Sequence, residues 1–500
     1  MVPFAVSDAV CQLALGVKLT PTVSPWLWAS VFAQTLAAGL SPQVAQQQRD
    51  ARLVALLRAA HDSPLYRQRL RHTRIGGLDG LRALEPVDKA ELMQRFDEWS
   101  TDRAVTRDAV ERFLEGSRMA DAFLGRYLVW TSSGTSGKPG IFVQDEHCLA
   151  VYESLDALRL RGPAAHAVPL PAWSAGQRFA FIAATGGPFA GAVAIERLQR
   201  LRRAPAPLTW LAPSLQSLSV QTPLSELACQ LQASQPTVLI TYPSCAAALA
   251  QRQLDGTLRL RLSEVWLGGE QVSDGQRALL RRAFACPLRN NYGASEFFTI
   301  ACECAHGRLH LNEDWVVLEP VDKQMRPVAV GEASHAVLLT HLANHVQPLL
   351  RYRLDDAVRI TGERCPCGCA LAVIEVQGRS GHTLVMHDAH DRPVTLLPLA
   401  LETAIELAAQ VTQFQLLCTA PDALELRFEP AVADAGAAFT RARTALRAFL
   451  SQHGLDAVRI VHGRQPPVRE SASGKLLRVR LAPAKARHAS DTPHGAPFGE

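Results

Sequence analysis

One short stretch of this 500-residue chain combines the residue types that bind phosphate. It runs Thr131-Ser132-Ser133-Gly134-Thr135-Ser136-Gly137-Lys138-Pro139. Glycine lets a backbone approach a ligand closely, hydroxyl and backbone N–H groups donate to phosphate oxygens, and lysine adds a mobile positive charge. Residues 125–130 before it and 141–144 after it both read as strands. A P-loop of the NTPase type has G-x-x-x-x-G-K-[ST] followed by a helix, and neither feature is present. The stretch therefore predicts a phosphate-binding loop of another type, with a polar hairpin loop as the alternative.

Four later segments place charged or aromatic residues beside glycine or serine. They are Asn290-Asn291-Tyr292-Gly293-Ala294-Ser295-Glu296, Arg351-Tyr352-Arg353-Leu354-Asp355-Asp356, Gly378-Arg379-Ser380 and Ser471-Ala472-Ser473-Gly474-Lys475. Taken alone, each segment is as easily a turn with an exposed charge. Their order along the chain is what makes the set of segments informative about function.

In that order, these segments and the phosphate-binding stretch resemble the motifs of adenylate-forming enzymes. This superfamily contains acyl-CoA synthetases, luciferases and the adenylation domains of peptide synthetases. The resemblance covers roughly residues 50 to 480. Within the superfamily, the segment 61–92, with its HDSPLYRQRL run, resembles the phenylacetate–coenzyme A ligase branch.

The resemblance implies a role for each matching residue. Lys475 would steady the carboxylate and the leaving group, and Lys138 and Glu296 would act at the phosphates, with Glu296 binding Mg²⁺. Tyr292 would lie against the adenine, and Asp356 would hold the ribose hydroxyls. Further contacts to the nucleotide are expected from Thr131, Ser132, Ser133, Gly134, Thr135, Ser136, Gly137, Gly269, Glu270, Gly293, Ser295 and Arg379.

Two positions depart from the family pattern. Leu354 and Asp355 stand where threonine and glycine are usual, so Asp355 stays open as the ribose ligand in place of Asp356. Gly381 and His382 stand where an acidic hinge residue is usual, so the identity of the hinge stays open too.

Cysteine and histidine residues gather in segments 302–310 and 365–369. Two Cys-x-Cys pairs and a histidine can hold a tetrahedral zinc ion through sulfur and nitrogen, and some members of the phenylacetate ligase branch carry such a site. The predicted ligands are Cys304, His310, Cys365 and Cys367, with Cys302 and Cys369 in reserve. The ion would be structural. The alternative is a set of reduced, buried thiols.

Composition limits the class of protein. With 48% hydrophobic and 20% charged residues, the chain is typical of globular proteins with large cores. The net charge of +5 is small, and the basic residues near the C-terminus lack interleaved aromatics, so no nucleic-acid partner is expected. We find neither a signal peptide nor an apolar run long enough for a membrane span, and therefore expect a cytoplasmic protein with free thiols.

Strand-like runs that alternate with helical ones predict an α/β fold with a largely parallel sheet. The expected organisation is an N-terminal helical arm (1–48), a large ATP- and acid-binding domain of layered sheets and helices (49–378), and a small mobile α+β domain (379–500). The small domain would carry the lysine loop.

The predicted function is ATP-dependent activation of a carboxylic acid, aromatic by its branch resemblance, to an acyl-adenylate. Transfer to the thiol of coenzyme A would follow, with release of AMP and pyrophosphate. Two alternatives stay open: transfer to a carrier-protein phosphopantetheine or another acceptor, and a non-catalytic adenylate-binding protein. A homodimer is left open as well.

Overall fold

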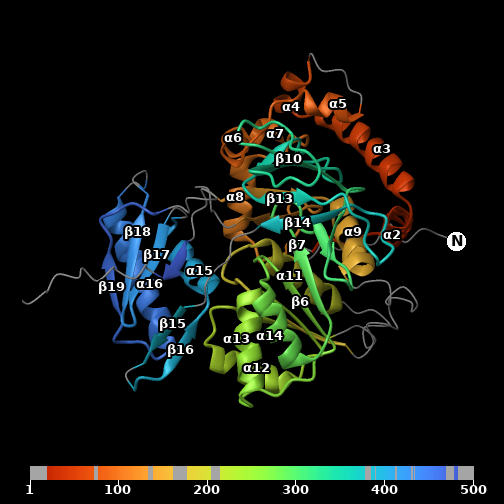
Figure 1. Cartoon of the computed structure of the whole chain (residues 1–500). Coiled ribbons are helices and arrows are strands. Elements are labelled where there is room, and N and C mark those ends of the chain that lie inside the picture. Colours follow the sequence, from red (N-terminus) through yellow and green to blue (C-terminus); the bar gives the residue numbers. More distant parts are fainter. Residues whose placement is uncertain are drawn as a thin grey trace, which may run out of the picture.

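A larger body of helices and sheets lies beside a smaller one in the computed structural model of the chain (Figure 1). The structure describes residues 20–71, 77–132, 139–160, 177–203, 214–377, 384–388, 390–411, 414–429, 432, 434–468 and 478–481. Among these residues, no helix has both the length and the apolar character needed to cross a lipid bilayer.

Short helices form most of the first hundred described residues. They are α2 (Pro25–Leu40), α3 (Pro42–Ala60), α4 (Pro64–Arg69), α5 (Gly77–Arg82), α6 (Lys89–Gln94), α7 (Phe96–Trp99) and α8 (Arg107–Gly116). Ser24, Ser41 and Ser63 each accept a hydrogen bond from a first-turn N–H and precede a proline at the first helical position. Both features favour helix initiation. Helix α3 runs without a break through residue 48, where the sequence placed the end of the arm.

A nine-stranded sheet in the order β13-β14-β9-β8-β7-β6-β5-β3-β4 forms the centre of the larger body. The strands β4, β3, β5, β6 and β7 pair in parallel, and the remaining pairs are antiparallel. The strands are β3 (Arg178–Ala183), β4 (Ser214–Ser219), β5 (Val238–Thr241), β6 (Glu264–Gly268), β7 (Leu288–Tyr292), β8 (Ala301–Glu303), β9 (Leu309–Leu311), β13 (Ala357–Ile360) and β14 (Val373–Gln377).

The helices in this part of the chain lie against the sheet or against one another. They are α9 (Glu146–Leu155), the π-helix η2 (Asp156–Leu160), α11 (Ala190–Arg203), α12 (Leu224–Ser234), α13 (Pro243–Leu254) and α14 (Asp274–Phe284). Helices α12, α13 and α14 lie side by side in Figure 1, and their apolar faces join the core of this region.

Two small sheets complete the larger body. The strands β1 (Leu128–Thr131) and β2 (Ile141–Gln144) form an antiparallel hairpin, as the sequence predicted for the flanks of the phosphate-binding stretch. The strands β10 (Val316–Val321), β11 (Ala336–His341) and β12 (Tyr352–Leu354) form an antiparallel sheet.

The smaller body contains a four-stranded sheet in the order β19-β18-β17-β20. Its elements are β15 (Leu384–His387), β16 (Pro393–Leu396), α15 (Pro398–Ala409), β17 (Phe414–Ala420), β18 (Ala423–Phe428), α16 (Ala435–Gln452), β19 (Arg459–His462) and β20 (Val479–Leu481). Helix α15 faces the larger body: a Cβ at Gly186 would lie 3.0 Å from Leu407 Cδ1. The loop that follows β3 is therefore in contact with the smaller body.

Candidate active site and metal centre

The parallel strands bring the ends of several predicted site segments to one edge of the main sheet. Strands β3, β5, β6 and β7 end at Ala183, Thr241, Gly268 and Tyr292. Because these strands are parallel, their carboxyl ends lie at the same edge, which is where ligands bind in open α/β sheets. Segments 269–270 and 293–296 begin at this edge.

The flanks of the phosphate-binding stretch are fixed by main-chain bonds. The Thr131 N–H donates to the Pro188 carbonyl oxygen at 2.7 Å, and the Ser132 N–H donates to the Gly140 carbonyl oxygen at 2.9 Å. The Gly140 N–H donates to Ser132 Oγ at 2.8 Å. Residues 133–138, with Lys138, lie outside the described residues. Ser132 thus marks where the loop leaves the hairpin, and Gly140 marks where the chain rejoins it.

A side chain of β1 holds the segment that follows β7. Trp130 Nε1 donates to the Ser295 carbonyl oxygen at 2.8 Å. Within that segment, the Ala294 N–H donates to the Phe297 carbonyl oxygen at 2.9 Å. The turn passes so close to itself that a Cβ at Gly293 would lie 2.0 Å from the Phe298 carbonyl oxygen. Only glycine fits at this position.

Two tyrosine hydroxyls hold the two acids that were predicted to act at the nucleotide. Tyr352 donates to Glu296 Oε1 at 2.7 Å, and Tyr292 donates to Asp356 Oδ2 at 3.1 Å. Burial raises the pKa of Glu296, while the Tyr352 hydroxyl and the positive charge of Lys89 act against that rise. The chain thereby brings residues 292–296 and 352–356 together with Trp130.

Asp355, the alternative ribose ligand, faces solvent and not Tyr292. Asp355 is exposed and pairs with Arg353, whose Nε lies 2.8 Å from Asp355 Oδ1. Asp356 is therefore the acid of this pair that lies beside Tyr292.

Gly269 and Glu270 sit at the end of β6. Gly269 has a φ of +77°, and a Cβ there would lie 2.8 Å from the Tyr242 ring. Both Glu270 carboxylate oxygens accept hydrogen bonds from Ser244, one from its N–H and one from its hydroxyl, each at 2.9 Å. Burial raises the pKa of Glu270 to about 7. Glu270 is thus engaged in capping α13.

Arg379 and Lys475, like residues 133–138 with Lys138, lie outside the described residues. The chain next to Lys475 is anchored, because the Arg478 guanidinium pairs with Glu406 and with Glu402 of α15. Arg478 and α15 thus fix where the segment that carries Lys475 joins β20.

The four predicted metal ligands come together. Ligand atoms of Cys304, His310, Cys365 and Cys367 all lie within 4.8 Å of one another. His310 stands on β9, Cys304 follows β8, and the two other cysteines lie in the loop between β13 and β14. The antiparallel pairing of β8, β9 and β14 brings these segments side by side.

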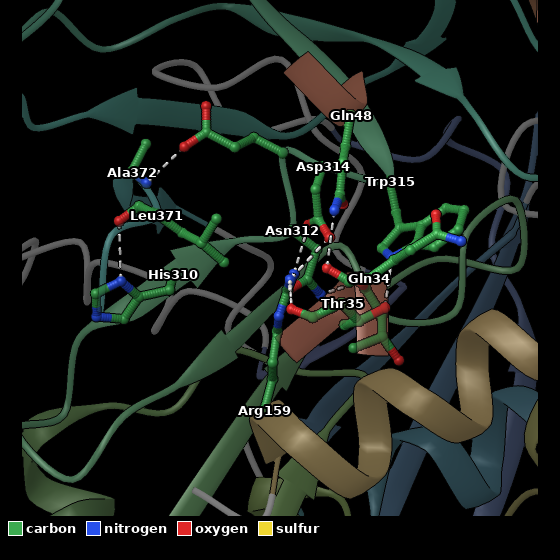
Figure 2. Close-up of polar contacts among 12 residues, drawn as sticks. Gln34, Thr35, Gln48, Arg159, His310, Asn312, Asp314, Trp315, Leu371 and Ala372 are labelled. Carbon is green, nitrogen blue, oxygen red and sulfur yellow. Dashed lines mark hydrogen bonds and ion pairs between the residues drawn. The ribbon is translucent and has the colours of Figure 1, made fainter. Parts of the chain in front are cut away.

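The chemistry of this cluster fits zinc. His310 Nδ1 bonds the Leu371 carbonyl oxygen at 3.0 Å (Figure 2), and His310 Nε2 lies 3.3 Å from Cys367 Sγ. Burial alone would raise the pKa of Cys365, but hydrogen bonds from Cys367 and His310 lower it to about 7. Burial and the neighbouring thiols raise the pKa of Cys367 to about 12, so Cys365 is the one of this pair that more readily forms the thiolate, which is the form that binds metal.

The two reserve cysteines lie around this cluster. Cys302 is buried against Phe179 and Trp266. The Cys369 N–H donates to Cys367 Sγ at 3.4 Å. An N–H bond to a ligand sulfur is the kind of contact that orients metal ligands.

Sequence reasoning missed three residues of the active-site region: Trp130, Tyr352 and Lys89. The sequence carried one signal for Tyr352, since it belongs to the segment that contains Asp356. The contact of Trp130 with Ser295 has no signal in the sequence, because 165 positions separate them.

Comparisons with known proteins support the fold. No family model matches the chain. The structure of 2-hydroxyisobutyryl-CoA ligase in complex with 2-HIB-AMP and CoA is similar, with a TM-score of 0.51 and 19% identity, over 87% of this chain and 89% of that chain. Protein CapK of Staphylococcus aureus is 29% identical over 136 residues, which is 27% of this chain and 29% of CapK. The chain thus matches less than a third of that relative's length.

Proposed function

From the fold that this chain shares with an adenylate-forming acyl-CoA ligase, we propose that it activates a carboxylic acid with ATP and transfers the acyl group to a thiol. The predicted α/β fold, with a large body and a smaller C-terminal one, is confirmed by this similarity. The observation that carries the proposal is the cluster built by the Trp130–Ser295, Tyr352–Glu296 and Tyr292–Asp356 hydrogen bonds. Segments far apart in the sequence meet there and supply an aromatic ring and two carboxylates, the residue types that the proposed nucleotide site uses.

The first step makes a carboxylate into an acyl donor. A carboxylate oxygen attacks the α-phosphorus of ATP, the bond from that phosphorus to the bridging oxygen breaks, and pyrophosphate leaves with the electron pair. Catalysis of such a step rests on positioning and on stabilising charge at the phosphates. A covalent nucleophile from the protein is not needed.

Each residue of this hydrogen-bonded cluster would have a part in this step. Asp356, oriented by Tyr292, would accept hydrogen bonds from the ribose hydroxyls, and the Tyr292 ring would lie beside the adenine. Glu296, oriented by Tyr352, would hold Mg²⁺, which neutralises phosphate charge when bound. Because Gly293 has no side chain, the turn stays tight, and this places the Ser295 carbonyl at Trp130 and the Glu296 carboxylate at Tyr352.

Lys138 and Lys475 complete the proposal. Lys138 would bind the phosphates, and Lys475 would contact the carboxylate at the moment of attack. Arg478, which follows Lys475 closely in the sequence, is paired with Glu402 and Glu406 of α15, and this pairing supports the proposed role. Arg379 would add a contact to the ribose or phosphates.

The second step passes the acyl group to sulfur. The thiol attacks the carbonyl carbon of the acyl-adenylate, and AMP leaves. We propose coenzyme A as the acceptor and an aromatic acid as the substrate. A carrier-protein phosphopantetheine is the alternative acceptor, and thioester formation with each thiol distinguishes the two.

We also propose a structural zinc ion on Cys304, His310, Cys365 and Cys367. Three sulfurs and one imidazole nitrogen within 4.8 Å are the donor set and spacing that support it. Elemental analysis of purified protein tests this directly: about one zinc per chain is expected, and protein without zinc would overturn it.

Acid-dependent exchange of labelled pyrophosphate into ATP tests the adenylation step. We expect exchange with some members of a panel of aryl and small aliphatic acids. Glu296→Gln should reduce it by about a hundredfold, as expected when a transition-state charge contact is lost. Glu332→Gln, at an exposed position, is the matched control. Exchange that is absent with every acid, or that is unaffected by Glu296→Gln, would refute the proposal.

A further inference from the structure

The loop that supplies two of the metal-binding cysteines lies against the turn between α2 and α3. The Ala370 N–H donates to the Gly39 carbonyl oxygen at 3.1 Å. Leu371 is buried in a small apolar cluster with Ala38 and Ala45. Because the Leu371 carbonyl also bonds His310 Nδ1 at 3.0 Å, one residue contacts both a metal ligand and the helical hairpin.

The chain that follows His310 carries a second set of contacts to the same hairpin (Figure 2). Arg159 binds both carboxylate oxygens of Asp314, at 2.6 and 2.8 Å, and donates to the Thr35 carbonyl oxygen at 3.1 Å. Trp315 Nε1 donates to Thr35 Oγ1 at 2.9 Å. The Asp314 side chain is fully buried, with 0% of its surface exposed. A fully buried carboxylate is stable only when it is paired, and Arg159 provides that pairing while it also contacts the hairpin.

The other end of the hairpin reaches helices that flank the phosphate-binding stretch. The Ser24 N–H donates to Glu146 Oε1 of α9 at 2.6 Å, and Arg197 Nε of α11 donates to the Pro21 carbonyl oxygen at 2.9 Å. Helix α9 follows β2, and α11 begins two residues after Pro188, which accepts the Thr131 bond. The hairpin therefore spans the larger body from the metal cluster to the neighbourhood of the active site.

We propose that metal binding at Cys304, His310, Cys365 and Cys367 docks the α2–α3 hairpin onto the larger body. The metal fixes the 365–371 loop, and this loop presents the Ala370 N–H and the Leu371 side chain to the hairpin. Without metal, three thiols and an imidazole have no common partner, and the loop is held by fewer contacts. The proposal rests on the metal site and not on the adenylation chemistry, so either can fail alone.

The coupling is reciprocal by thermodynamic linkage. If metal binding favours the docked hairpin, then docking must strengthen metal affinity by the same factor. This gives two independent experiments on the full chain, neither of which measures enzymatic activity.

The first experiment is amide hydrogen exchange of zinc-loaded and chelator-stripped protein, with zinc content measured in each sample. After stripping, we expect faster exchange in peptides from 365–372 and also from α2, and unchanged exchange in α12, which is remote from the cluster. Faster exchange restricted to 304–310 and 365–372, with α2 unchanged, would overturn the proposal. Purified protein that holds no zinc would overturn it as well.

The second experiment measures zinc affinity by competition with a chromophoric chelator. Leu371→Ala removes the side chain that packs on Ala38 and Ala45 but keeps the carbonyl that bonds His310. We expect zinc affinity to fall on the order of tenfold, within the usual range of coupling between sites. Leu254→Ala, at an exposed position at the end of α13, should bind zinc as the unaltered chain does. Equal affinities for both variants would contradict the coupling.

Discussion

Replacing Gly293 with alanine tests whether the turn at 293–298 builds the active site. In the structure, a Cβ at this position would lie 2.0 Å from the Phe298 carbonyl oxygen and 2.8 Å from its carbon. Side-chain carbons do not approach other atoms closer than 3.0 Å. The neighbour is backbone rather than a flexible side chain, so the turn itself has to open.

The expected cost follows from the bonds that this opening disturbs. Overpacking in a well-packed region costs about 1–3 kcal/mol. The Ala294–Phe297 and Trp130–Ser295 hydrogen bonds contribute about 1 kcal/mol each, and both depend on the shape of the turn. The total is about 3–5 kcal/mol, which lowers the melting temperature of a domain this large on the order of 5–10 °C.

Thermal melting and pyrophosphate exchange together provide the assay. Gly116→Ala is the matched control, because a Cβ at this last residue of α8 meets nothing within 4 Å. The control should melt at or slightly above the temperature of the unaltered chain, since alanine is favoured over glycine in a helix by about 1 kcal/mol. For Gly293→Ala we expect the lower melting temperature and, below it, an exchange rate reduced at least about tenfold, because Glu296 is displaced. A variant that melts and exchanges like Gly116→Ala would refute the reasoning.

Three further predictions concern single side chains. Asp356→Asn should raise the KM for ATP by about tenfold or more through loss of a charged hydrogen-bond acceptor. Asp355→Asn should leave the KM unchanged, because the native Asp355 carboxylate faces solvent beside Arg353. A raised KM in Asp355→Asn with an unchanged KM in Asp356→Asn would assign the ribose to Asp355. Lys475→Ala should lower pyrophosphate exchange on the order of a hundredfold or more with the melting temperature unchanged, and normal exchange would remove Lys475 from the mechanism. Burial lowers the pKa of His341 to about 3. The neutral ring therefore contributes fully to the free energy of unfolding above about pH 6.5. This contribution is lost as the pH falls from about 6.5 toward 3, by up to about 1.4 kcal/mol per pH unit. His341→Gln should flatten the fall in denaturation midpoint over that range, and an unchanged slope would show that His341 is not the group responsible.

The local structure around the active site was readable from the sequence because short-range rules determine it. Apolar runs on both sides of the phosphate-binding stretch predicted strands, and β1 and β2 occupy them. A serine followed by a proline is typical of a helix start, and α4 begins at Ser63 and Pro64. The boundary of the arm at residue 48 had no such signal, and α3 continues through it.

The long-range contacts of the site depend on the fold and could not be read from the sequence. Tyr352 on β12 and Glu296 in the turn between β7 and β8 are 56 positions apart. Pattern rules place each of them in a turn or strand, but only the packing of β12 against the end of β7 brings the hydroxyl to the carboxylate. The same holds for Trp130 on β1, whose contact with Ser295 reaches the turn between β7 and β8.

The metal ligands are an intermediate case. The sequence offered six candidate ligands, four preferred and two in reserve, and the four preferred ones are those whose ligand atoms lie within 4.8 Å of one another. The contact between the 365–371 loop and the end of α2 had no counterpart in the sequence, because it joins Gly39 to Ala370.

A crystal structure of the chain soaked with ATP and a mixture of aryl acids addresses the central claim most directly. We predict electron density for a nucleotide with its ribose at Asp356, its adenine against Tyr292 and its phosphates between Glu296 and the 133–138 stretch. A nucleotide bound elsewhere, with Glu296 and Asp356 untouched, would contradict the account.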